Sequence, residues 1–480
     1  MFLFFCLGGI ALSVIQIFFI LNPLGISIYD ISYYYCVLAA FLSPVFLVFP
    51  PYKASRRDVL PWYDLLLFSS TFCICIYFAI HGLDIFNEGW MFSSPKLPTI
   101  LGLILCLSVV DAVRRTAGIL LASLSLFFFF FPTFASLIPP PFSGVSFSLW
   151  KTISIQSMGS DSLVGMPIWV FSMMLIGFMI FGVALVVTGG GEFFINLAYA
   201  MLGRTRGGPA KVAIFASGLF GSLSGTAVSN VLTTGAITIP AMKKLGYPAH
   251  YAAAVETNAS TGGVLLPPVM GAVAFIMAMW LGIPYATVCG AALIPALLYF
   301  FALLMQIDAY AAKKHFTGLD RSEIPSLLIT LRNGWPYLFS FLMLIWFLVF
   351  LRLEGQAPFY ATLALITIAI FRKKNRLSLD GFFSFIEQAG KVLVELIAIF
   401  AGVSLMIGGL IMTGVSSAFA SEITALAGNN EILLLVLGAV TALVLGTGMP
   451  VITCYVFLGL VLAPALTNLG FNVLGVHLFV

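Results

Sequence analysis

The chain has 480 residues, of which 61% are hydrophobic and only 8% are charged, and its formal net charge is +4. A mean hydropathy of +1.11 excludes a water-surrounded globule, whose surface needs far more charge. The few basic residues lie in short loops, which does not favour nucleic-acid binding. Apolar stretches of about 20 residues recur along the chain and predict an all-α polytopic membrane protein, because helices satisfy their own backbone hydrogen bonds in lipid.

The N-terminal part of the chain is predicted to hold four membrane spans and a linking span. The four spans lie near residues 2–21, 31–49, 63–81 and 98–112, and the linking span covers about 116–136.

The orientation of these spans follows from the basic loops, because Lys and Arg are retained on the cytoplasmic side of a membrane. Lys53, Arg56 and Arg57 follow the second span, and Arg114 and Arg115 follow the fourth. We therefore predict that these loops and the N-terminus are cytoplasmic.

A long apolar stretch from Val212 to Met242 is broken in its middle by the polar run 221–230. It contains no ionisable side chain, and Lys243 and Lys244 follow it at once. Basic residues near both ends predict a re-entrant hairpin that enters and leaves on the cytoplasmic side and has a polar tip. A continuous span is the alternative.

The next stretch, residues 247–280, carries two interruptions. The run 258–263 and the proline pair 267–268 both oppose a continuous helix, because glycine is costly in a helix and proline lacks the amide donor. We therefore predict a broken helix. Further spans are predicted at 286–306, 336–351, 357–371 and 392–412.

Two parts of the chain resemble each other at a nearly constant offset. Residues 188–203 match 413–428, and residues 240–246 match 464–470. The common order of these matches predicts an internal repeat. Counting the membrane crossings between the copies predicts that the second is inverted, with a hairpin at about 432–466 that enters from outside. Inverted repeats with broken helices are typical of secondary transporters.

The interruptions carry the candidate ion and substrate ligands. Carbonyls, hydroxyls and amides of an unwound segment are hard oxygen ligands that suit sodium, and exposed helix N-termini attract a substrate carboxylate. The candidate sodium ligands of the first hairpin are Ser222, Ser224, Gly225, Thr226, Ser229 and Asn230. The candidate substrate-binding residues are Asn258, Ser260, Thr261, Gly262, Gly263, Pro267 and Pro268. The alternative is that these residues only permit close helix packing.

Ionisable residues inside the predicted spans are few, although such residues often mark proton paths. Glu395 lies four residues after Lys391, a spacing at which the two side chains can pair. Glu256 lies near His250, where a gating role and a structural role are equally open. Because no ladder of acids runs through the spans, the sequence favours a sodium site over a proton relay.

Three motifs carry a resemblance to a known family. They are GSLSGTAVSN at 221–230, IPAMKKLGYP at 239–248 and ETNASTGGVLLPPVMGA at 256–272. The chain resembles the fused permease of TRAP (tripartite ATP-independent periplasmic) transporters, of the TAXI type. The resemblance covers nearly the whole chain. It is weak over the first four spans, which look like the small subunit fused ahead of the large one.

The resemblance implies sodium-driven uptake of a small organic acid, such as a dicarboxylate, a keto acid or an amino acid. It implies a partner, a periplasmic TAXI-type substrate-binding protein, and an elevator motion of the part that bears the hairpins. It also implies a multi-pass protein of the inner membrane of a prokaryote.

The same resemblance implies the domain boundaries and a second ion site. The implied regions are a four-span small-subunit-like region 1–112, a linking span and external loop 113–160, and a transport region 161–480 with repeats at 161–310 and 390–480. The implied second sodium site consists of Gly446, Thr447, Gly448 and Met449.

The second copy departs from the family pattern. The proline pair of the first copy follows Gly246, and its equivalent at the same distance beyond Gly470 would fall after Val480. We therefore expect a permease whose second repeat is truncated and which does not transport by itself. Sodium-dependent uptake into proteoliposomes that contain only this chain would contradict that expectation.

A proton-coupled carrier that works without a binding protein is the alternative function. Uptake that needs a proton gradient but neither sodium nor a partner would favour it. A membrane enzyme would need a nucleophile–base pair or a metal cluster. The four histidines have no partner at a useful spacing: His81, His250, His315 and His477. We therefore expect no enzyme activity and no cofactor other than sodium as the coupling ion.

Overall fold

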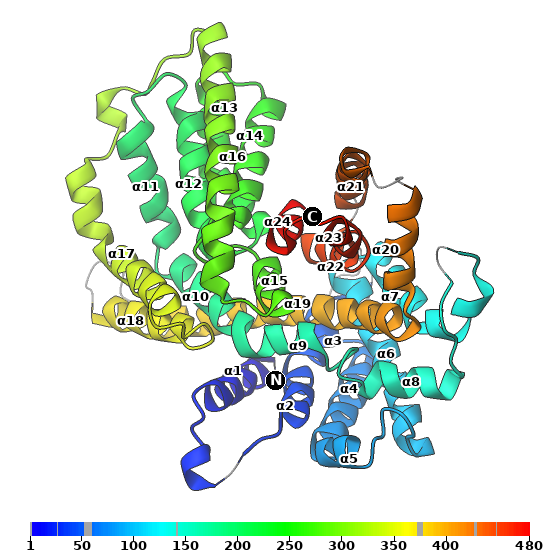
Figure 1. The fold of residues 1–480 in the computed structure, drawn as a ribbon. Coiled ribbons are helices and arrows are strands. Elements are labelled where there is room, and N and C mark those ends of the chain that lie inside the picture. Colours follow the sequence, from blue (N-terminus) through cyan, green and yellow to red (C-terminus); the bar gives the residue numbers. More distant parts are fainter. Residues whose placement is uncertain are drawn as a thin grey trace. The chain divides into compact units, whose positions relative to one another are not determined.

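The structure is a computed structural model that describes residues 2–25, 27–51, 60–140, 143–371, 378–426, 430–447 and 449–480. Throughout these ranges the regular structure is helical, and none of them contains a β-strand (Figure 1). The predicted all-α fold is confirmed. The basic residues Lys53, Arg56 and Arg57, on which part of the predicted orientation rests, lie outside the described residues, as does Gly448.

Eight helical segments of the described chain are long and apolar enough to cross a membrane, as expected for a polytopic protein. They are Asp30–Val48, Trp62–Ile80, Lys96–Thr116, Met166–Val187, Tyr285–Lys313, Arg321–Val349, Leu379–Thr413 and Val451–Asn468. Three further predicted spans form shorter apolar helices, which are Phe2–Ile17, Ile119–Thr133 and Ala357–Phe371.

The chain forms two compact units, with boundaries at Ile176/Gly177 and Phe385/Ile386. Unit 1 comprises Met1–Ile176 and Ile386–Val480, and unit 2 comprises Gly177–Phe385. The predicted boundaries at 112 and 160 concern the small-subunit and large-subunit regions, and they stay predictions.

Unit 1 contains the first nine helices and the C-terminal ones (Figure 1). The first nine are α1 (Phe2–Ile17), α2 (Asp30–Val37), α3 (Val45–Val48), α4 (Trp62–Ile80), α5 (Gly82–Asn87), α6 (Lys96–Thr116), α7 (Ile119–Phe130), α8 (Leu149–Met158) and α9 (Met166–Val170). The C-terminal ones are α20 (Val415–Leu426), α21 (Glu431–Gly446), α22 (Val451–Val461), α23 (Ala463–Asn468) and α24 (Val473–Phe479). Helix α19 (Leu379–Thr413) enters this unit at Ile386.

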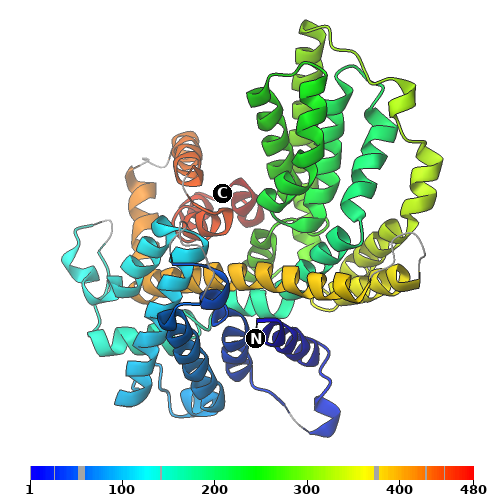
Figure 2. The same cartoon turned by 180° about the vertical axis from the view of Figure 1, so that it is seen from behind.

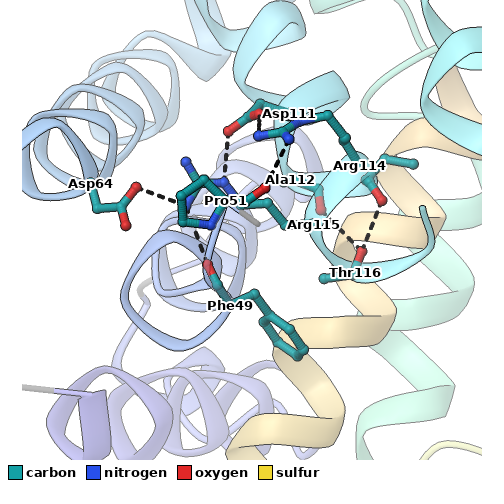
Figure 3. A network of polar contacts seen from close by, with 9 residues as sticks. Phe49, Pro51, Asp64, Asp111, Ala112, Arg114, Arg115 and Thr116 are labelled. Atoms are coloured by element: carbon teal, nitrogen blue, oxygen red, sulfur yellow. Dashed lines mark hydrogen bonds and ion pairs between the residues drawn. The ribbon is translucent and has the colours of Figure 1, made fainter. Parts of the chain in front are cut away.

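A buried ionic network joins the ends of α4 and α6 to the chain after α3 (Figure 3). The guanidinium of Arg115 lies 2.7 Å from Asp64 and 2.7 Å from Asp111, and it donates to the Phe49 carbonyl at 3.2 Å. The Arg115 and Asp64 side chains are only 2% and 0% exposed. Arg114 binds the same Asp111 carboxylate. The arginine pair used to predict orientation therefore also holds three segments together.

Unit 2 contains the candidate functional elements. Its helices are α10 (Ile176–Val187), α11 (Gly190–Leu202), α12 (Gly208–Ser224), α13 (Ala227–Lys244), α14 (Ala249–Leu265), α15 (Ala272–Leu281), α16 (Tyr285–Lys313), α17 (Leu327–Val349) and α18 (Ala357–Phe371). Helices α12, α13, α14 and α16 lie side by side in both views (Figures 1 and 2). Small and aliphatic side chains fill the core between them, among them Ala213, Ile214, Ala252, Val255 and Ile307.

Two glycine pairs that the predicted repeat matches have similar backbone angles. Gly189 and its match Gly414 both have left-handed φ angles, of 93° and 71°, and each stands between two helices. Gly246 and its match Gly470 have φ angles of 101° and 95°. A side chain is strained in this conformation, so both pairs require glycine for the same turn. The inverted orientation of the second copy stays a prediction.

The four-residue spacing allowed an ion pair between Lys391 and Glu395, but the structure pairs Lys391 with another residue. Its ammonium group lies 2.6 Å from Glu387, one turn earlier in α19. An acid four residues before a lysine is the better-oriented partner on a helix, because its charge lies nearer the positive end of the helix dipole.

We predict that Asp64→Asn lowers the stability of the protein by about 3 kcal/mol, because it removes one carboxylate from a buried ionic network. The melting temperature of the purified protein in detergent measures the loss. Glu387→Gln, which breaks a pair whose side chains are about half exposed, is the control and should cost less than about 0.5 kcal/mol. Equal melting temperatures for both variants would contradict the structural role of the network.

Candidate functional site

The tip of the first hairpin is a two-residue turn between α12 and α13. Helix α12 ends at Ser224, Gly225 has a left-handed φ of 65°, Thr226 is extended, and α13 begins at Ala227. Glycine is favoured here because it adopts this φ without strain. A hairpin of two helices was predicted, and the structure has it. The break is narrower than the polar run 221–230, and the entry of the hairpin from the cytoplasmic side stays a prediction.

The predicted break at 258–263 is wrong, because α14 runs through it to Leu265. Polar side chains in this stretch turn back onto their own helix: the Asn258 amide donates to the Ala254 carbonyl and the Thr261 hydroxyl to the Thr257 carbonyl, both at 2.9 Å. Such bonds leave the helical ladder intact. The helix breaks only at 266–271, where the proline pair predicted a break.

The hairpin tip and the break of the second helix adjoin each other. The Val269 amide donates to the Ser222 carbonyl at 3.1 Å, so the break is hydrogen-bonded to the last turn of α12. A Cβ atom added at Gly225 would lie 2.9 Å from the Met270 carbonyl oxygen. The structure therefore brings the predicted ion-binding tip and the predicted proline-containing segment together.

Helix α16 also contacts the break at 266–271, through Tyr285. The buried Tyr285 hydroxyl lies within hydrogen-bonding distance of two carbonyls, that of Pro268 at 3.0 Å and that of Val269, and shares its one proton between them. The ring of Tyr285 stacks on Phe275 of α15, with ring centroids 4.2 Å apart. The carbonyls that the break exposes are thus partly satisfied by one tyrosine, as buried backbone groups require.

The candidate sodium ligands of the tip differ in what surrounds them. The Ser222 hydroxyl is buried and donates to the Leu219 carbonyl at 2.8 Å. Asn230 is fully buried, and its amide donates to the Ser217 carbonyl at 2.7 Å. Thr226 is half-buried and Ser229 is exposed. The backbone of Ser224 closes α12, but its side chain lies outside the described part.

Two of the candidate substrate-binding glycines are sites of close packing. A Cβ atom at Gly263 would lie 2.9 Å from the Gly221 Cα atom and 2.8 Å from the Ser217 carbonyl oxygen. One at Gly262 would lie 2.4 Å from the Tyr299 ring. These contacts favour the packing interpretation for both glycines.

A second polar cluster lies behind the tip, around the fully buried Glu256 of α14. The Ser217 hydroxyl of α12 donates to Glu256 Oε1 at 2.6 Å, and the Ser260 hydroxyl lies 3.4 Å from the same oxygen. From α13, Thr234 donates to Oε1 and Thr238 donates to Oε2. We call Glu256 with these four hydroxyls the carboxylate cluster. It joins three helices of unit 2.

Glu256 and Ser260 were candidate residues in the sequence, whereas Ser217, Thr234 and Thr238 were not predicted. A signal for the last two existed, because Asn230, Thr234 and Thr238 follow one another at intervals of four residues and share one face of a helix. Their common target is on another helix, and the spacing alone did not identify it.

The second candidate ion site belongs to unit 1 and is described by itself. Helix α21 ends at Gly446, and the exposed Thr447 hydroxyl donates to the Val444 carbonyl at 2.7 Å. The Met449 amide donates to the Leu445 carbonyl at 3.1 Å. Gly446 does not share the left-handed φ of Gly225.

Comparison with known proteins gives consistent matches over the larger part of the chain. The family model described as the tripartite ATP-independent periplasmic transporter, DctM component, matches residues 104–480. The C4-dicarboxylate TRAP transporter large permease protein DctM of Pseudomonas aeruginosa is 27% identical over 337 residues, which are 68% of this chain and 78% of that protein.

Two further relatives differ in their named solutes. The isethionate TRAP transporter permease protein DctMQ of Oleidesulfovibrio alaskensis is 25% identical over 379 residues, which are 78% of this chain and 59% of that protein. The ectoine/5-hydroxyectoine TRAP transporter large permease protein UehC of Ruegeria pomeroyi is 25% identical over 263 residues, which are 54% of this chain and 60% of that protein.

We predict that Gly263→Ala destabilises the protein by about 1–3 kcal/mol, because the added methyl group would force α12 and α14 apart. Thermal unfolding of the purified protein in detergent measures the effect. Gly290→Ala in α16 is the matched control, since a Cβ atom there meets no other atom within 4 Å and alanine favours a helix. An unchanged melting temperature for Gly263→Ala would show that the two helices are not in close contact.

Proposed function

Because this chain belongs to the DctM family of tripartite ATP-independent periplasmic (TRAP) transporter permeases, we propose that it imports a small organic acid together with sodium. The members of this family are membrane transporters, so the proposal starts from a transport role for this chain. Sodium coupling, the class of solute and the partner are the proposal.

Four helix ends meet at one place, and their charges support the proposed binding of an ion and a solute there. Helices α12 and α14 end at Ser224 and Leu265, and α13 and α15 begin at Ala227 and Ala272. The hydrogen bond from Val269 to the Ser222 carbonyl joins the two breaks. C-terminal ends present carbonyl oxygens and negative dipole ends that suit a cation, and N-terminal ends present amides that suit a carboxylate. This meeting of unlike helix ends is the observation on which the proposal rests.

The proposed sodium ligands are the oxygens of the hairpin tip, between Ser222 and Asn230. The proposed solute position is the break around Pro267 and Pro268, because α15 begins directly after it. In the second copy, the corresponding proposal is the turn after Gly446. Asn258 and Thr261 fit this proposal less well, since their side chains bond their own helix.

The solute is proposed to be a small organic anion. Two relatives are named for C4-dicarboxylates and for isethionate, and both are compact anions that a helix N-terminus suits. One net positive charge carried inward with the solute would contribute about 2.3 kcal/mol per 100 mV of membrane potential. Sodium coupling could therefore drive accumulation of the anion against its gradient.

The proposed partner is a periplasmic TAXI-type substrate-binding protein, and the proposed location is the inner membrane with a cytoplasmic N-terminus. The first helices precede the segment that the family model matches. One relative is named as the permease protein DctMQ. We propose that residues 1–112, which contain helices α1 to α5 and most of α6, act as the small-subunit part of a fused permease.

We predict that sodium stabilises the purified protein, relative to potassium at the same ionic strength. Ligand binding to the folded state contributes about 2.7 kcal/mol when the ion concentration is 100 times its Kd. Thr226→Val should remove most of this stabilisation, because the threonine hydroxyl at the tip does not cap α13 and is available as a ligand. The melting temperature in detergent, measured against sodium concentration, checks both expectations.

The matched control is Thr441→Val in α21, whose hydroxyl is bonded to the Leu437 carbonyl of its own helix. This variant should respond to sodium like the wild-type protein. If the wild-type melting temperature is the same in sodium and in potassium, the sodium proposal is wrong.

A further inference from the structure

The carboxylate cluster places an acidic group in the interior of unit 2 without a bonded positive charge. Glu256 is fully buried, and its oxygens accept hydrogen bonds from hydroxyls of α12, α13 and α14. In the described part of the chain, no lysine, arginine or histidine bonds this carboxylate. A buried ion pair would have neutralised the charge, but among the described residues the carboxylate oxygens are bonded by hydroxyl groups.

The charged groups on the surrounding helices are engaged elsewhere or lie at the helix ends. Lys211 of α12 lies 2.5 Å from Asp308 of α16, and Lys244 of α13 lies 3.1 Å from Glu323. The other ionisable groups of α13, α14 and α16 are exposed or have neutral partners: Lys243, His250, Tyr251, Tyr285, Cys289, Tyr299, Tyr310 and Lys313. None of them has a bond to Glu256.

The two threonines of the cluster each have a second acceptor on their own helix. The Thr234 hydroxyl lies 2.8 Å from the Asn230 carbonyl, and the Thr238 hydroxyl lies 3.1 Å from the Thr234 carbonyl. A hydroxyl has only one proton to donate. Each threonine can therefore donate its one proton either to the carboxylate or to its own helix.

We propose that Glu256 is a proton-binding site that is loaded and emptied during the transport cycle. A hydronium ion gives its proton to Oε2, so one O–H bond forms on the carboxyl group, one breaks in the hydronium ion, and the charge changes from −1 to 0. The new O–H group donates to the Thr238 oxygen, and the Thr238 proton turns to the Thr234 carbonyl. Release to water on the other side of the membrane reverses these steps.

The physical basis is a balance between two opposing terms. Burial without a cation disfavours the ionised carboxylate, while up to four hydroxyl donors stabilise it. The same hydroxyls tie α12 and α13 to α14, so a change of charge alters the bonds that hold the hairpin in place. This site goes beyond the proposed sodium coupling, and proton binding at Glu256 requires neither sodium nor solute.

Infrared spectroscopy of the full-length purified protein tests proton binding directly. Titration through the pH range should reveal the carbonyl stretch of a protonated buried carboxyl group that disappears as pH rises. Glu256→Gln should abolish this band, and Glu422→Gln, which changes an exposed glutamate of α20, should leave it unchanged.

Thr238→Val separates a titrating role from a merely structural one. This near-isosteric change keeps the carboxyl group but removes two hydrogen bonds, the one that Thr238 donates to the ionised form and the one that it accepts from the protonated form. The bond to the charged carboxylate is the stronger of the two. The midpoint of the band should therefore differ from that of the wild-type protein. A structural role alone predicts no such shift. The variant also keeps the test valid if Glu256→Gln does not fold.

Two results would overturn the proposal. One is the absence of a carboxyl band that depends on Glu256 at any pH at which the protein is folded. The other is a band whose midpoint is the same in Thr238→Val and in the wild-type protein. Because the measurement needs no transport, failure of sodium-driven uptake would leave it interpretable, and the two proposals can fail separately.

Discussion

The structure of unit 2 depends on one constraint, which is that backbone groups freed at a helix break inside an apolar protein must find partners. The chain breaks two helices close to each other and lets the breaks satisfy one another. The Val269 amide donates to the Ser222 carbonyl, and the Tyr285 hydroxyl shares its proton between the carbonyls of Pro268 and Val269. The two breaks thereby satisfy part of each other's freed backbone groups, and carbonyl and amide ends remain gathered for an ion and an anion.

Close helix packing makes this meeting possible, and it is achieved with small residues rather than with a large apolar core. Gly221 and Gly263 let α12 and α14 approach until their Cα atoms are nearly in contact. Behind them, hydroxyls from three helices converge on Glu256. Small residues and hydroxyl bonds are the usual means of joining helices in lipid, where apolar side chains gain little by leaving the surrounding hydrocarbon.

Composition and helix-breaking residues were sufficient to predict the helical class, the first hairpin and the break at the proline pair. They failed at 258–263, because the sequence does not reveal that Asn258 and Thr261 bond their own helix rather than unwinding it. They also failed for the carboxylate cluster and for the pair of Arg115 with Asp64, because these side chains are distant in sequence. Local propensity predicts where a helix can break, whereas tertiary contacts decide which polar residue is left available.

The hairpin tip and the break after α14 are proposed to form one sodium-responsive site. Hydrogen–deuterium exchange of the purified protein tests it most directly, because the amides of 222–230 and 263–271 report on both elements at once. The account predicts that sodium, but not potassium, slows exchange in both segments together, with the same concentration dependence. No response to sodium, or a response of one segment without the other, would contradict it.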